Sequence, residues 1–185
     1  MRALISLPLL ASGLAACSTL PATERTPYLP PGVYGVYEDN DIGAINQSAW
    51  AFASPANTKG NPVDAAKAVV ALEYLSGELK ENPRWIGMDA AIPLHMARAR
   101  DDLRQILGIR PDAPPQVVVN TLLALSLDLE TGNGSAAMQV LTSPVFTQPP
   151  ERTLQLLSNL PYVQQANLAT ARAEEESFPA TGERS

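Results

Sequence analysis

Apolar residues recur at helical spacing through most of the chain from residue 45 onward. The clearest case begins at Asn61-Pro62, where a capping residue is followed by proline at the first helical position. Its apolar stripe reaches Leu79, and Asn82-Pro83 ends the segment. A second stripe covers about residues 88–107, and Gly108 follows at the position after a helix end that favours glycine. These patterns predict two long amphipathic helices joined by a short turn.

The segment 116–130 differs because its apolar residues surround nearly the whole helical circumference. Three consecutive valines also permit a strand, but the pattern continues to Leu129 without a turn signal, which favours a helix. A helix that is apolar on most sides belongs in the middle of a bundle. We therefore expect this helix at the centre of the domain. Shorter helices are expected around residues 45–53, 135–141, 150–160 and 162–176.

Six or seven helices separated by turns rich in proline and glycine, with no repeated β pattern, predict an all-α domain over residues 39–176. The expected architecture is a small irregular bundle. A solenoid of helical hairpins is the alternative, although no fixed repeat period supports it. The final segment, 177–185, is expected to be disordered.

The segment 17–38 contains four prolines, which predict an extended tether ahead of the bundle. At ~3.1 Å per residue, about twenty residues could span up to ~60 Å if fully stretched. The stretch 33–37 alternates weakly between apolar and other residues. We interpret it as an arm laid along the domain with its tyrosine rings over apolar surface, and a short strand is the alternative.

The first sixteen residues combine a basic start at Arg2 with a short apolar run. Fourteen residues at ~1.5 Å rise extend ~21 Å as a helix, which is short of a hydrocarbon core of about 30 Å. The pattern therefore predicts a removable export signal over residues 1–16 rather than a transmembrane helix. No second apolar stretch of ~18 residues follows.

The end of this run, Leu14-Ala15-Ala16-Cys17, resembles the lipobox of bacterial lipoproteins, in which leucine precedes two small residues and a cysteine. The resemblance implies that the Cys17 thiol receives a diacylglycerol group and that a signal peptidase cuts before Cys17. It also implies acylation, for example with palmitate, of the new amine. Ser18 in place of aspartate implies the periplasmic face of the outer membrane rather than inner-membrane retention. A plain secretory signal with a chance cysteine is the alternative.

Composition narrows the possible functions further. The 185 residues, 45% of them hydrophobic, suit a single ordinary domain. One cysteine excludes a disulfide scaffold and a cysteine-built metal cluster. The 13 Lys and Arg against 19 Asp and Glu give a formal net charge of −6, which argues against nucleic acid as the main partner.

Candidate chemistry is sparse. His95 is the single histidine, so it cannot form a two-histidine metal site, and we interpret it as a residue at the edge of an apolar stripe. Neither a Gly-x-Ser-x-Gly elbow nor a glycine-rich phosphate loop occurs. Glu73, flanked by apolar residues, is the best candidate acid for a cell-wall hydrolase, but its helical phase predicts a solvated side chain. We therefore assign no catalytic residue, metal ligand or cofactor.

One charged region is a candidate interaction surface. Arg84, Arg98 and Arg104 lie within reach of Trp85 if the two long helices bring them together, and arginine and tryptophan are common interface anchors. The alternative is that the run 98–104 forms ion pairs along a solvated helix face.

Together these features favour a lipid-anchored envelope protein that acts without catalysis, as a structural module or through contact with an envelope protein partner. Its attachment to the membrane would be the lipid on Cys17. A periplasmic binder of a small apolar ligand between helices is the alternative. A cell-wall hydrolase that uses Glu73 is the third hypothesis.

Overall fold

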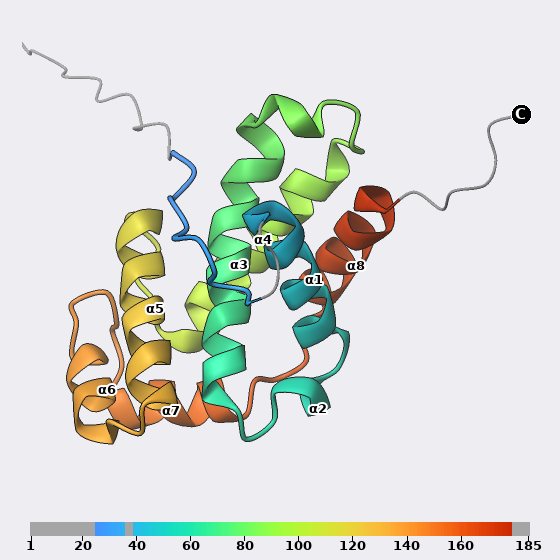
Figure 1. Cartoon of the computed structure of the whole chain (residues 1–185). Helices are drawn as coiled ribbons and strands as arrows, with labels where there is room; N and C mark the ends of the chain where they lie inside the picture. The colour runs from blue at the N-terminus through green and yellow to red at the C-terminus, as the bar shows by residue number, and fades with distance from the viewer. Residues whose placement is uncertain (1–24, 36–38, 179–185) are drawn as a thin grey trace, which may run out of the picture.

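A computed structural model describes residues 25–35 and 39–178 of the chain. These residues form eight α-helices and one 3₁₀ turn, η1 (Pro83–Trp85), without a β-strand, which confirms the predicted all-α class (Figure 1). The predicted signal 1–16, Cys17 and residues 179–185 of the expected tail lie outside the described residues. The helices are α1 (Asn40–Ala53), α2 (Pro55–Thr58), α3 (Pro62–Glu81), α4 (Ala91–Leu107), α5 (Pro115–Glu130), α6 (Gly134–Val140), α7 (Pro150–Ser158) and α8 (Gln164–Ser177).

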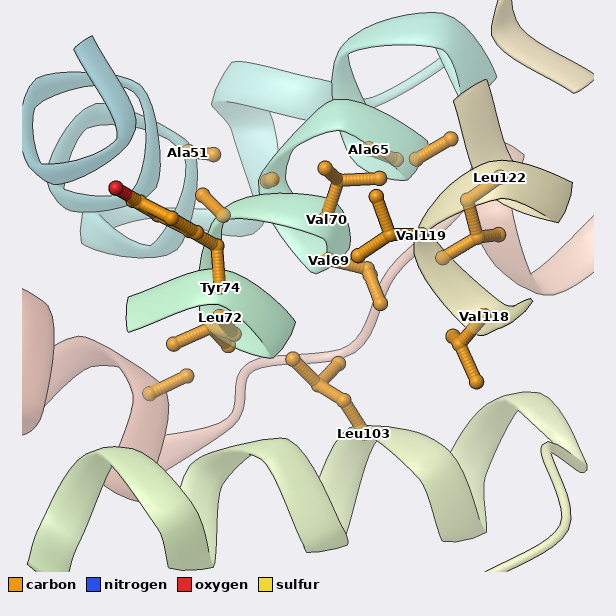
Figure 2. Packing of buried hydrophobic residues seen from close by; sticks show 14 of the residues in the cluster. Ala51, Ala65, Val69, Val70, Leu72, Tyr74, Leu103, Val118, Val119 and Leu122 are labelled. Atoms are coloured by element: carbon orange, nitrogen blue, oxygen red, sulfur yellow. The ribbon is translucent and has the colours of Figure 1, made fainter. Parts of the chain in front are cut away.

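Helix α3 is the centre of the bundle, and α1, α4, α5 and α7 all pack against it. Between Ala65 and Leu79, every residue except Lys67 and Gly77 is buried. The many alanines and valines of α3 are small, so neighbouring helices can approach on several sides. Figure 2 shows Val69 and Val70 of α3 facing Val119 and Leu122 of α5, with Leu103 of α4 beneath.

The prediction that α5 occupies the centre is wrong. This helix packs against α3 and α6 and lies at the edge of the bundle (Figure 1). Its outward side leaves Val117 45% exposed and Leu127 60% exposed. Apolar residues around a helix describe its surface chemistry, whereas the number of neighbouring helices depends on contacts between distant parts of the chain.

The helix boundaries follow local sequence signals. The Asn61 side chain caps α3 by accepting a hydrogen bond from the Asp64 backbone N–H at 3.2 Å, and Pro62 is the first helical residue. Gly108 follows α4 with a φ of +66°, a left-handed conformation that glycine adopts without steric cost. Helix α4 starts at Ala91, so Pro93 falls in its first turn, where proline is tolerated.

The described part of the expected tether, residues 25–35, lies along the helical domain, and we call it the arm. Leu29 is 2% exposed, and Tyr34, 8% exposed, donates its hydroxyl proton to the backbone carbonyl of Lys67 at 3.4 Å. Gln116 of α5 both accepts from the Tyr28 backbone N–H, at 2.7 Å, and donates to its carbonyl, at 3.2 Å. Residues 31–35 form a turn, so the arm interpretation describes this stretch better than a strand. Residues 36–38 lie outside the described part.

None of the helices in the described residues combines the length and the apolarity needed to cross a membrane.

Candidate functional site

A buried ion pair joins α3 to α4. Arg104 donates from Nε to Glu73 Oε1 and from Nη2 to Glu73 Oε2, both at 2.7 Å. Its Nη1 also donates to the backbone carbonyls of Pro111 at 3.0 Å and Ala113 at 2.9 Å. Glu73 is 1% exposed and Arg104 is 2% exposed. The guanidinium therefore ties α3, α4 and the connection to α5 together at one buried point.

The predicted solvated positions of Glu73 and Arg104 are wrong. Glu73 lies on the side of α3 that faces α4, where Arg104 covers it, because neighbouring helices pack against α3 on several sides. Both Glu73 oxygens accept hydrogen bonds from one guanidinium, whereas a general acid must hold and release a proton at such an oxygen. This geometry argues against the hydrolase hypothesis based on Glu73.

The predicted interaction residues divide between different places. Arg84 and Trp85 lie together in η1, with the guanidinium carbon 4.8 Å from the centre of the indole ring. Arg98 is exposed on α4, and Arg104 is buried. Six residues along a helix turn the direction of a side chain by about 240°, so Arg98 and Arg104 occupy different faces of α4. Only Arg84 and Trp85 are brought into contact.

Arg84 also fixes the turn that carries Trp85. Its Nη1 donates to Asp39 Oδ2 at 2.6 Å and to Asp41 Oδ2 at 3.1 Å, both at the start of α1. Tyr74 of α3 donates its hydroxyl proton to Asp41 Oδ1 at 2.5 Å. Partial burial acts against ionisation of Asp39, but the hydrogen bond and charge of Arg84, together with the backbone N–H groups of Ile42 and Asp41, outweigh it and lower the pKa of Asp39. The turn after α3 is thus joined to the beginning of α1.

Glu78 lies beside this cluster and accepts a hydrogen bond from the Asn82 side-chain amide. Burial, with the nearby negative charge of Asp41 adding to it, raises the pKa of Glu78. Burial likewise raises the pKa of Tyr74, and its hydrogen bond to Asp41 contributes. These groups meet where α1, α3 and the η1 turn come together, and the sequence analysis missed them because they come from three separate elements.

A cleft of about 830 Å³ opens beside Trp85. Its walls come from α3, the loop 85–88, α4 and the arm, whose Arg25 and Pro27 line it. Ile86 is 84% exposed and Leu94 is 62% exposed, and both contribute to the apolar wall. Sequence analysis missed Ile86 and Leu94 because they lie outside the helical stripes. The available signal was an apolar Trp-Ile-Gly-Met run one residue after a helix-ending Asn-Pro pair.

A second, largely apolar surface lies on α5, where three of the four exposed residues on one face are apolar and Asn120 is polar. Val117, Asn120, Ala124 and Leu127 are exposed and follow one another at spacings of three, four and three residues, so they share one helix face. We call these four residues the α5 outer face. Tyr28 of the arm, 66% exposed, adjoins its first turn through the hydrogen bonds with Gln116. The pattern that suggested a central helix therefore supplies an exposed apolar stripe.

Among the described residues, no group of three or more His, Cys, Asp and Glu side chains is arranged to hold a metal ion. His95 is partly buried on α4. No protein-family model matches the sequence, and comparisons with curated proteins and with solved structures give no match.

Proposed function

We propose that this chain is a lipid-anchored envelope protein, held by Cys17 at the periplasmic face of the outer membrane. Its helical domain is a non-enzymatic module that binds a protein partner. The anchoring proposal is supported by the resemblance of Leu14-Ala15-Ala16-Cys17 to a lipobox. Two or three acyl chains on one residue would anchor the protein stably, whereas a single chain binds only reversibly.

The binding proposal depends on the α5 outer face. Scattered apolar residues on a protein surface need no explanation, but aligned ones on a single helix face do. Val117 and Leu127 are ten residues apart, which separates them by about 15 Å along the helix axis. A stripe of that length fits an apolar helix or groove of a partner, in the way amphipathic helices dock.

Anchoring is tested by the Cys17→Ser variant. We expect it to lose metabolic labelling with palmitate and to leave the precursor uncut or the protein unattached. Labelling that persists in the variant would contradict lipidation of Cys17.

Partner binding is tested by placing a photocrosslinking amino acid at Leu127 in intact cells. Tyr162 is a matched control position because it is 55% exposed and lies in the short connection before α8, outside the α5 outer face. We expect one discrete crosslinked product from position 127, its disappearance when Val117→Glu is added, and none from position 162. Equal products from both positions, or a product insensitive to Val117→Glu, would contradict a specific contact on α5.

The cleft supports a second candidate function, the binding of a small apolar ligand. Its volume of about 830 Å³ lies within the range of about 300–1,000 Å³ that small-molecule sites occupy. Native mass spectrometry of the protein purified from envelopes would show a retained mass, lost in Leu94→Glu. A parent protein without a retained mass would favour the partner-binding function.

A further inference from the structure

We infer that the loop Trp85-Ile86-Gly87-Met88, which we call the apical loop, enters the membrane interface and sets the orientation of the domain on the bilayer. This inference rests on the proposed lipid anchor at Cys17. It concerns the end of the bundle opposite to α2 and α6 (Figure 1).

Three chain segments meet at this end. The beginning of the arm lies beside the end of α3, because Thr26 donates its hydroxyl proton to Glu81 Oε2 at 3.2 Å. The end of α8 lies beside the apical loop, because the Asp89 backbone N–H donates to Glu176 Oε2 at 2.9 Å. The chain that leads back to Cys17 therefore leaves the domain at the same end as the apical loop.

This end exposes large apolar side chains. Ile86 is 84% exposed, the highest value among the exposed large apolar residues of the described chain. Leu94 in the first turn of α4 is 62% exposed, and Phe178 just after α8 is 51% exposed. Trp85 is half-buried against the core and its indole nitrogen is enclosed, so Ile86 is the large apolar side chain that the apical loop presents to the outside.

The apical loop is held in this exposed shape by hydrogen bonds. The Ile86 N–H donates to the Pro83 carbonyl and the Met88 N–H to the Trp85 carbonyl, each at 3.1 Å. Arg84, directly before the loop, is fixed by Asp39 and Asp41. Little further ordering is therefore needed for Ile86 to enter an apolar phase, which favours insertion.

The length of chain between the anchor and the domain limits where the membrane can lie. Seven residues, 18–24, separate Cys17 from Arg25. Eight steps at ~3.6 Å or less reach at most ~29 Å. The packed arm adds no length to this span, because Leu29 is buried and Tyr28 is bonded to α5. Lipidated Cys17 would keep the apical end close to the bilayer.

Charges at this end have both signs. Arg84 is already paired with Asp39 and Asp41, and Glu81, Asp89 and Glu176 accompany Lys80 at this end, so anionic headgroups would gain little attraction. We expect the contact to be apolar and to be similar on zwitterionic and on anionic bilayers.

The two tryptophans allow a direct test with full-length lipidated protein. In Trp50→Phe, the remaining indole is Trp85; in Trp85→Phe, the remaining indole is Trp50, which is 45% exposed near the end of α1. Each variant is reconstituted into phosphatidylcholine vesicles with or without brominated acyl chains, which quench nearby indoles. We expect quenching of Trp85, which lies next to Ile86 in the chain, and none of Trp50. Ile86→Ser in the Trp50→Phe background should weaken the quenching, and Tyr162→Ser, at an exposed position outside both proposed contact surfaces, should leave it unchanged.

The outcomes separate the two proposals. Flotation of the protein with the vesicles reports the anchor, and quenching reports the orientation. Protein that floats while Trp85 remains as unquenched as Trp50 overturns the apical contact and leaves the anchor standing. Quenching that survives Ile86→Ser undiminished also overturns insertion of the loop. Protein that fails to float overturns the anchor, and with it this orientation. Circular dichroism of each variant checks that the helical fold is retained.

Discussion

Replacing Glu73 by glutamine should destabilise the domain strongly, although the two side chains have almost the same shape. The change removes a negative charge that is 1% exposed and leaves the Arg104 guanidinium, 2% exposed, without that carboxylate. One carboxylate oxygen that accepts at 2.7 Å becomes an amide NH₂ group facing a donor. Removing one partner of a buried ion pair costs about 3–5 kcal/mol.

The loss should be visible in both chemical and thermal unfolding. At a urea dependence of about 2 kcal/mol per molar, a loss of about 3 kcal/mol lowers the midpoint by about 1.5 M. In thermal unfolding the same loss corresponds to roughly 6–12 °C in Tm. Circular dichroism at 222 nm follows either transition, because the described domain is helical.

A double variant separates the charge from the packing. Glu73→Leu combined with Arg104→Met removes both charges, and such replacements are often neutral or stabilising. Here the carbonyls of Pro111 and Ala113 lose their donor, so we expect the double variant to remain somewhat less stable than the parent. It should nevertheless be more stable than Glu73→Gln. If Glu73→Gln unfolds within about 1 kcal/mol of the parent, the account of this pair as a buried, mutually dependent unit is refuted.

Three further changes test other parts of the structure. Burial raises the pKa of Glu78 in the fold, so the folded protein binds a proton at Glu78 more tightly than the unfolded chain does. The resulting stability is present below about pH 4.5 and is lost as pH rises through the folded-state pKa. Glu78→Gln should therefore raise the urea midpoint at pH 7 but not at pH 4, and an equal effect at both pH values would contradict this account of Glu78. Gly77→Ala places a Cβ 2.7 Å from the Oγ1 atom and 3.0 Å from the Cα atom of Thr26. Hydrogen exchange of the arm amides should therefore accelerate while the α3 amides stay protected. Unchanged exchange of the arm would argue against this close contact. Gly108→Ala and Gly132→Ala share the cost of a left-handed alanine, about 1–2 kcal/mol. Of these two positions, only Gly108 also brings a clash, because its Cβ would lie 2.6 Å from a glutamine side chain. The Tm should therefore fall further for Gly108→Ala, and equal falls would show that the glutamine moves aside freely.

Local features of the fold could be predicted from the sequence. The cap at Asn61, the proline after it and the glycine after α4 each act within a few residues, so their patterns are legible without tertiary information. Features that depend on contacts between distant parts of the chain could not be predicted from the sequence. Glu73 and Arg104 are 31 residues apart, and nothing near either residue signals the other. Their burial follows from the central position of α3, which the sequence analysis gave to α5.

The candidate surfaces show the same division. Arg84 and Trp85 are adjacent in sequence and do contact each other, whereas the expected convergence with Arg98 and Arg104 required a helix phase that α4 does not have. The exposed stripe on α5 was present in the apolar pattern but was interpreted as core. An apolar helix face looks the same in sequence whether the same chain or another molecule covers it.

The packed arm has a mechanical consequence. Tension applied to the chain ahead of Arg25 would first reach the hydrogen bond from Thr26 to Glu81, then the paired Tyr28 and Gln116 bonds and the buried Leu29, before it pulled on the backbone of any helix. The Asn40 side chain, which donates to the Leu29 carbonyl at 3.0 Å, connects that point to the start of α1. Under load the arm should detach first and lengthen the tether by about ten residues, while the helical bundle remains folded.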